Sequence, residues 1–191
     1  MSEIGLNRFF NVFVSHANED METVNKFATI LAWNNVNPLV AENFKEPGVL
    51  LWKDKIKRLV NESHYFVVLY TYNAQNKVKI HQEIGSAGIR DKRIIVILQQ
   101  GIEKKDLPGY LEGLEVVENF EPSNPSGAFN NVTCILLNDW YGKTFPRLEQ
   151  INQFYGYHEN HGKIKFKFDD VSEKWTTYRY EQMGSWVMFE Y

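Results

Sequence analysis

Apolar residues form two kinds of pattern along the first 140 residues of the chain. Short runs of β-branched and aromatic residues lack polar alternation, which predicts strands that are buried on both faces. These runs occupy residues 11–16, 39–41, 65–70 and 93–98, with a weak edge strand expected at 114–117. Between the runs, apolar residues recur at helical spacing and predict helices. The predicted helices cover residues 18–34, about 51–60, 78–87, and a last segment through Val132 and Trp140 that ends at Gly142.

The alternation of strands and helices, with short connections, predicts the architecture of this part of the chain. Strands that are apolar on both faces belong in a parallel sheet with helices on either side. We therefore expect an α/β fold with a doubly wound, flavodoxin-like parallel sheet.

The pattern changes to a period of two from Lys163 onward. The segment KIKFKF places Ile164, Phe166 and Phe168 on one face and three lysines on the other, and WTTYRY and SWVMFEY follow across short polar turns. This pattern predicts a three-stranded antiparallel β-meander. Two regions are thus expected, an α/β domain over residues 8–142 and an aromatic-rich C-terminal β extension over 143–191.

Composition excludes several classes of protein. With 43% hydrophobic and 24% charged residues, the 191-residue chain is unlike collagen-like, disordered or disulfide-scaffold proteins. The single cysteine, Cys134, cannot form an intramolecular disulfide, which favours a reducing compartment. The N-terminus lacks the pattern of a signal peptide, and no apolar run approaches the roughly 18 residues of a membrane span. We therefore expect a cytoplasmic protein with no membrane partner.

Aromatic residues are unevenly distributed along the chain. Half of the 28 aromatic residues lie between Trp140 and Tyr191. Such a segment can stack nucleobases, but its lysine face is short and the chain has a net charge of −3. We therefore expect no nucleic-acid partner, and assign these rings mainly to packing, with self-association as the next use.

The loops that follow the strands decide the chemistry, because ligands of open α/β sheets bind beyond the carboxyl ends of the strands. The first loop, SHANED, contains no glycine and is neither a P-loop nor a dinucleotide-binding turn. The third strand ends in Tyr70 and Thr71, where a receiver domain would need a phosphate-accepting aspartate. These common functions of doubly wound proteins are therefore excluded.

Three segments, in order and with consistent spacing, resemble those of Toll/interleukin-1 receptor (TIR) domains. They are NVFVSHANED, then AENFKEPG with VLLWKDKIKRLVNESHYFVVLYT, then IHQEIGSAG with RIIVIL. The resemblance covers about Asn11 to Trp140, and its last segment is similar to the QEIG.A…IIPIL pattern of prokaryotic stand-alone TIR proteins. The segment after Gly142 has no counterpart in that pattern.

The resemblance implies an NAD glycohydrolase, in some relatives a cyclase, which yields nicotinamide plus ADP-ribose or a cyclic ADP-ribose isomer. It also implies self-association through TIR–TIR contacts and a signalling or antiviral defence role. NAD is then the substrate, and no further cofactor is expected. A non-catalytic TIR interaction module is the main alternative, and a nucleoside or nucleotide glycosyl-transfer enzyme is a third.

The family's essential glutamate matches Glu83. The helix register, with Ile80, Ile84 and Ala87 as the packing stripe, predicts that Glu83 lies exposed at the edge of this stripe. The alternative is an ordinary surface glutamate paired with Lys79 one turn earlier. Many relatives have tryptophan where this chain has Lys79, so a ring that stacks on nicotinamide would come from Trp52 or Phe44.

The resemblance implies further substrate-binding residues, namely Ser15, His16, Glu46, Gly48 and Trp52. Ser15 and His16 end the first strand, and their alternative roles are a capping serine and a half-buried histidine. For Glu46 and Gly48 the alternative is a plain turn, and for Trp52 it is core packing. The HENH motif at 158–161 resembles half of a metal site, but suitable further ligands are missing, so we expect no metal.

Overall fold

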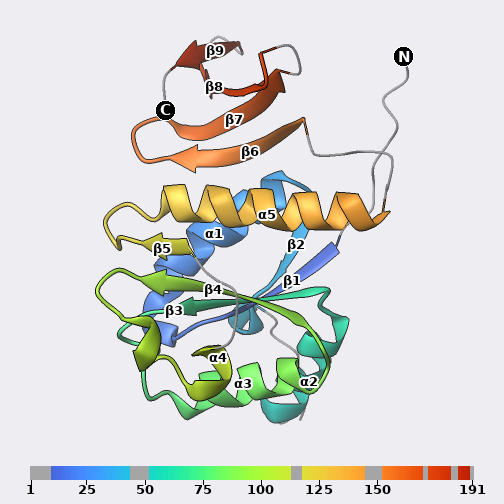
Figure 1. The fold of residues 1–191 in the computed structure, drawn as a ribbon, viewed down its shortest axis with the longest axis vertical. Helices are drawn as coiled ribbons and strands as arrows, with labels where there is room; N and C mark the ends of the chain where they lie inside the picture. Colours follow the sequence, from blue (N-terminus) through green and yellow to red (C-terminus); the bar gives the residue numbers. More distant parts are fainter. Residues whose placement is uncertain are drawn as a thin grey trace.

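The computed structural model describes residues 10–43, 52–112, 118–144, 152–169, 172–181 and 185–189. Its first part contains a five-stranded parallel sheet in the order β2-β1-β3-β4-β5 (Figure 1). The strands are β1 (Phe10–Ser15), β2 (Val36–Leu39), β3 (Tyr65–Tyr70), β4 (Arg93–Gln99) and β5 (Glu118–Phe120). The doubly wound parallel sheet expected from the sequence is confirmed.

Helices cover both faces of this sheet (Figure 1). The α-helices are α1 (Met21–Trp33), α2 (Trp52–Glu62), α3 (Val78–Gly88), α4 (Gly109–Glu112) and α5 (Ser126–Thr144). Short 3₁₀ helices are η1 (Asn18–Asp20), η2 (Ala41–Asn43) and η3 (Lys104–Asp106). Each face of the sheet therefore has its own core, and successive residues of a strand enter different cores. In β1, Val12 and Val14 join the core formed with α1 and α5, whereas Phe13 joins the core formed with α2 and α3.

Three predicted boundaries in this part need comment. The strand predicted at 39–41 is β2 at Val36–Leu39, and Ala41 instead begins η2. Pro38 lies inside β2 because an edge strand of the sheet tolerates a residue without an N–H.

The edge strand expected at 114–117 lies outside the described residues, and the fifth strand of the sheet is formed by Glu118–Phe120. The predicted helix end at Gly142 is wrong, because α5 continues to Thr144. A glycine inside a helix costs only about 1 kcal/mol, and the neighbouring Trp140 and Tyr141 pack against the core and hold the last turns in place.

The C-terminal region forms a separate antiparallel sheet in the order β6-β7-β8-β9. Its strands are β6 (Gln153–His158), β7 (Gly162–Asp169), β8 (Lys174–Tyr180) and β9 (Trp186–Phe189). The meander is confirmed, but the prediction of three strands is wrong because β6 was missed. Glycine weakens the sequence signal of a strand, and Gly156 lies in the middle of β6.

The C-terminal sheet is attached to the α/β part through β6, which runs beside α5 (Figure 1). The side-chain amide of Asn34 bonds both the N–H and the carbonyl of Tyr155, at 2.7 and 2.6 Å. Asn130 of α5 does the same for Tyr157, at 2.9 Å for each bond. These amides pair the edge of β6 that is turned away from β7. The apolar face of the sheet completes the core around α1 and α5. The residues that enter this core are Phe154, Ile164 and Phe166.

No helix in the described part of the chain is long and apolar enough to cross a membrane. The proposed division of the chain near residue 142 stays a prediction, since α5 passes through this position and the core is shared with the C-terminal sheet.

Candidate functional site

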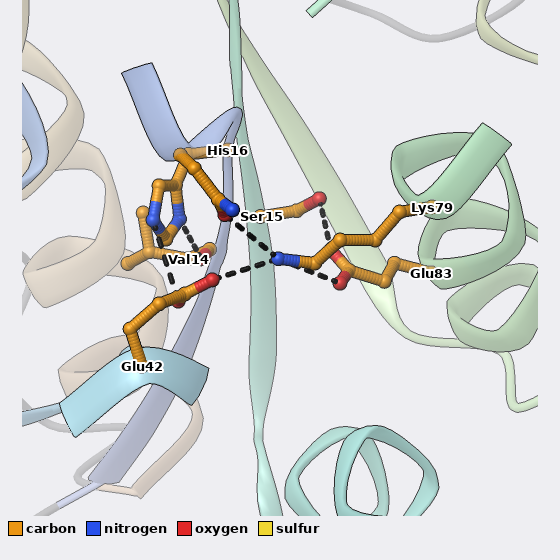
Figure 2. A network of polar contacts seen from close by, with 7 residues as sticks. Val14, Ser15, His16, Glu42, Lys79 and Glu83 are labelled. Carbon is orange, nitrogen blue, oxygen red and sulfur yellow. Dashed lines mark hydrogen bonds and ion pairs between the residues drawn. The ribbon is translucent and has the colours of Figure 1, made fainter. Parts of the chain in front are cut away.

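Polar side chains from three elements meet beyond the carboxyl end of β1 (Figure 2). Ser15 is the last residue of β1 and His16 follows it, Lys79 and Glu83 lie one turn apart on α3, and Glu42 lies on η2 after β2. This is the edge of an open parallel sheet where ligands bind in doubly wound folds. The first-strand and α3 residues named from the sequence are therefore brought together.

Glu83 is buried at the centre of this group, with 3% of its surface exposed. The Ser15 hydroxyl donates a hydrogen bond of 2.6 Å to Oε2, whereas Oε1 has no hydrogen-bond partner among the described groups. Burial raises the pKa of Glu83 to about 7, and the nearby Glu42 adds to this effect, while the Ser15 hydrogen bond and the Lys79 charge oppose it. The carboxyl group can therefore titrate near neutral pH.

The predicted exposure of Glu83 is wrong. Ile80, Ile84 and Ala87 are buried as expected, but Glu83 lies three residues after Ile80 and four before Ala87. It therefore lies within the packing stripe rather than beside it. The alternative of an ordinary surface glutamate paired with Lys79 is therefore also wrong, because Glu83 is buried and accepts a hydrogen bond from Ser15.

Lys79 lies between the two carboxylates of the site (Figure 2). Its Nζ is 2.7 Å from Glu42 Oε1, 4.0 Å from Glu83 Oε1 and 3.4 Å from the side-chain oxygen of Asn18. The ammonium group therefore pairs most closely with Glu42, and links η2 to α3 directly beside Glu83.

His16 supports Glu42 from the strand side. Its Nδ1 donates to the carbonyl of Val14 at 3.0 Å, which leaves Nε2 facing Glu42 Oε2 at 3.4 Å. The ring is 2% exposed and is thus fully buried rather than half-buried. Burial alone would raise the pKa of Glu42, but the Lys79 hydrogen bond and the charges of His16 and Lys79 hold this pKa below its ordinary value.

Other predicted site residues have different outcomes. Glu46, Gly48 and Phe44 lie outside the described residues, so their roles stay predictions. Trp52 is the first residue of α2, and its substrate-binding role also stays a prediction.

Sequence reasoning does not single out Glu42, although this glutamate is the second residue of the loop AENFKEPG, which is part of the resemblance to TIR domains. It also missed Asp20, which accepts hydrogen bonds of 2.5 Å from Thr71 and 2.7 Å from Asn73. Asp20 thereby ties the loop after β1 to the loop that leads into α3. The first loop follows Ser15 and the second precedes the helix of Glu83. Asp20 therefore helps to fix the positions of Ser15 and Glu83 relative to each other without touching either of them.

No cluster of three or more histidine, cysteine, aspartate or glutamate side chains is arranged for a metal ion within the part of the chain that the structure describes. His158 and His161 of the HENH motif stack on each other at 4.7 Å. Cys134 is partly buried on α5, where Asn138 approaches its sulfur at 3.5 Å.

A family model described as "TIR domain" matches residues 12–132, which is well over half of the chain. The chain belongs to the TIR domain family. The matched range contains Ser15, His16, Glu42, Lys79 and Glu83, whereas strands β6 to β9 lie outside it.

Solved structures with some similarity include other TIR domains. The chain is 14% identical to the TIR domains of the activated Roq1 resistosome that recognises the pathogen effector XopQ, with a TM-score of 0.45 over 50% of this chain and 60% of that one. A 2-desoxiribosyltransferase from Leishmania mexicana is 13% identical, with a TM-score of 0.39 over 46% of this chain and 63% of that one. The translation elongation factor SelB from Methanococcus maripaludis, in complex with a GTP analogue, is 10% identical, with a TM-score of 0.45 over 94% of this chain and 48% of that one. No curated protein matches the chain.

Proposed function

We propose that this TIR protein is an NAD glycohydrolase that cleaves the bond between nicotinamide and ribose. The observation that carries the proposal is the Glu83 carboxyl group, which is buried at the carboxyl edge of the sheet with one oxygen held by Ser15 and the other without a hydrogen bond. Buried polar atoms without a partner are uncommon and costly, and they concentrate at functional sites. The products are nicotinamide and either ADP-ribose or a cyclic isomer.

A single carboxylate suits this reaction. The bond between ribose C1′ and the nicotinamide nitrogen breaks, and its electron pair neutralises the positive charge of the departing nicotinamide. Positive charge then develops on the ribose, and the Glu83 carboxylate stabilises it or holds the ribose hydroxyls. The oxygen of water, or a hydroxyl of the ADP-ribose part, bonds to C1′ and releases its proton. Glu83 can accept this proton because its pKa is raised to about 7.

Access to Glu83 requires movement of Lys79 and Glu42. Their ion pair lies beside Glu83, and the two side chains are 30% and 23% exposed. An ion pair that is partly in contact with water is weak, so its rearrangement costs little compared with substrate binding. The ammonium of Lys79, 4.0 Å from Glu83, would also repel the positive charge of the nicotinamide ring if the substrate bound beside Glu83. We therefore propose that NAD binding moves Lys79 away from Glu83.

Ser15→Ala is expected to shift the pH dependence of NAD cleavage upward. The Ser15 hydrogen bond stabilises the ionised form of Glu83, so its loss raises the pKa of Glu83 further above about 7. Because a hydrogen bond to a charged group is worth about 1.5–3 kcal/mol, the midpoint of the profile should rise by about one pH unit or more. Activity at pH 7 then falls and recovers in part at pH 9.

The matched control for Ser15 is Ser126→Ala. Ser126 is also buried and donates a hydrogen bond of 2.8 Å to a glutamate, Glu159, but lies at the start of α5 away from the site. Rate profiles of both variants between pH 5.5 and 9.5 check the prediction. Equal midpoints for Ser15→Ala and the unmodified protein would contradict the role given to Ser15.

Incubation of the concentrated protein with NAD, followed by chromatography of the products, tests the proposed function. We expect release of nicotinamide, and the second product identifies hydrolysis or cyclisation. The absence of turnover at every protein concentration and with crowding agents would instead favour a non-catalytic TIR interaction module. Cleavage of free nucleosides in a parallel reaction would favour glycosyl transfer.

Self-association and a role in signalling or antiviral defence are further parts of the proposal. Family membership supports both, because TIR domains act through contacts with one another. Measurement of specific activity against protein concentration tests the first part, and activity that rises faster than concentration supports it.

A further inference from the structure

The face of the C-terminal sheet opposite its core face carries lysines between aromatic rings. Residues directly opposite each other on antiparallel strands share a face. The register places Lys165 of β7 between Tyr155 and Tyr178, and it places Lys163 opposite Tyr157 and Trp186 opposite Tyr180. The opposite face supplies the core residues Phe154, Ile164 and Phe166. The period of two therefore sorts the apolar residues to the core face and the lysines with their aromatic partners to the other face, where Lys167 is exposed and Lys163 and Lys165 are half-buried.

Contacts on this face join the lysines and rings into one continuous surface. Lys163 Nζ lies 4.2 Å from the ring centre of Tyr155 and 5.1 Å from that of Trp33 at the end of α1. Lys165 Nζ lies 4.8 Å from the ring centre of Trp186 and 5.0 Å from that of Tyr178. We call these residues, together with Lys167, the lysine–aromatic face.

The charge of this face differs from that of the whole protein. The strand register adds Lys174 and Asp169 to the same face as Lys167, so four lysines oppose one aspartate among its described residues. The whole chain has a net charge of −3. A concentrated positive face on an acidic protein indicates an anionic ligand.

We propose that the lysine–aromatic face binds single-stranded nucleic acid. Proteins that bind such strands combine cations for the phosphates with aromatic rings on which bases stack. Lys163, Lys165 and Lys167 alternate along β7 and are spaced about 6.8 Å apart, which is comparable to the separation of successive phosphates in an extended strand. Tyr155, Tyr178 and Trp186 flank this row and offer the stacking surfaces. Bases in a duplex are already stacked and paired, so a single strand fits better.

The existing contacts between lysines and rings do not prevent this binding. A cation–π contact near the surface is weaker than the stacking of a base on a ring, and the ammonium exchanges the ring for a phosphate. Two copies of the face would bring like charges together, which disfavours self-association through this face but leaves TIR–TIR contacts through other surfaces unaffected. The sequence pattern argues against nucleic acid because the net charge is −3 and the lysine face of one strand is short. The strand register changes the second point, because it adds Lys174 of β8 to the three lysines of β7 on one face of the sheet.

Fluorescence anisotropy with the full chain and a labelled oligothymidylate of about 12 nucleotides tests this proposal, since single-strand-binding folds cover ~4–16 nucleotides. We expect binding at low salt that weakens roughly 20-fold between 50 and 200 mM salt, as three phosphate contacts predict. The triple variant Lys163→Gln, Lys165→Gln, Lys167→Gln should lose at least about tenfold in affinity and most of this salt dependence. Tyr178→Ala and Trp186→Ala should each weaken binding at least about fivefold.

A charge-matched control is the triple variant Lys26→Gln, Lys104→Gln, Lys105→Gln, whose lysines lie on α1 and η3. It should bind like the unmodified protein, and circular dichroism and thermal unfolding check that all variants fold. No binding at 50 mM salt, or equal losses in both triple variants, would overturn the proposal. Binding that depends on the lysines but not on Tyr178 or Trp186, together with equal binding to phosphatidylserine vesicles, would also overturn it in favour of a general polyanion surface.

Discussion

Glu83→Gln is expected to reduce NAD cleavage at least about 100-fold while the protein stays folded. Glutamine has the same shape and can accept the Ser15 hydrogen bond, but it carries no negative charge to stabilise the developing positive charge on the ribose. Removal of one preorganised electrostatic contact from an active site costs roughly 10²–10³-fold in rate. Nicotinamide release under saturating NAD measures this effect.

The same substitution is expected to make the protein more stable at alkaline pH. The pKa of Glu83 is raised from 4.5 to about 7 in the folded protein, so this carboxyl group favours the folded state most at low pH. This contribution is fully present below pH 4.5 and is lost as the pH rises through 7. At pH 8 the folded protein bears the cost of a buried charge, up to about 3 kcal/mol for this pKa difference.

Glu83→Gln removes that cost, so its free energy of unfolding should exceed that of the unmodified protein by up to about 3 kcal/mol at pH 8. The difference should shrink toward pH 5, and urea unfolding at several pH values measures it. Glu159→Gln is the matched control, because Glu159 also accepts a hydrogen bond from a buried serine but lies outside the site. Full activity of Glu83→Gln would exclude the catalytic role. A stability difference that does not vary with pH would exclude the raised pKa.

The sequence located the site better than it described its environment. The resemblance to TIR domains implies Ser15 and His16 at the end of the first strand and Glu83 on the helix over residues 78–87, and the structure places all three in one group (Figure 2). The sequence pattern does not predict the burial of Glu83, because a charged residue of an amphipathic helix ordinarily lies outside the packing stripe. The contribution of Glu42 could not be predicted either, since it depends on the approach of η2 to α3 through Lys79.

The fold was predictable where strands and helices have strong local signals. Strands β1, β3 and β4 are apolar on both faces and were found close to their observed bounds. Strand β6 was missed because its stability comes from elsewhere in the chain. Its outer edge is paired by the side-chain amides of Asn34 and Asn130, and pairing between a strand and distant side chains leaves no periodic pattern in the sequence.

Gly156→Ala is expected to destabilise the protein by about 2–4 kcal/mol, from the combined cost of overpacking and of damaged hydrogen bonds. A Cβ atom at position 156 would lie only 2.7 Å from a ring carbon of Phe166 and would overlap the side-chain oxygen of Asn130. Both neighbours are buried, and Asn130 cannot withdraw without losing its bonds to the backbone of Tyr157. The close approach of α5 to β6 thus requires glycine at position 156. The same glycine weakens the strand signal of β6 in the sequence.

Gly142→Ala is the matched control and should have the opposite sign. A Cβ atom at Gly142 meets nothing within 4 Å, and the residue lies inside α5, where alanine favours the helix by about 0.5–1 kcal/mol. Thermal or urea unfolding of both variants measures the contrast. Equal stability of Gly156→Ala and the unmodified protein would show that β6 does not lie against Asn130. Destabilisation by Gly142→Ala would show that the helix ends before this residue, because only a helical Gly142 gains from the substitution.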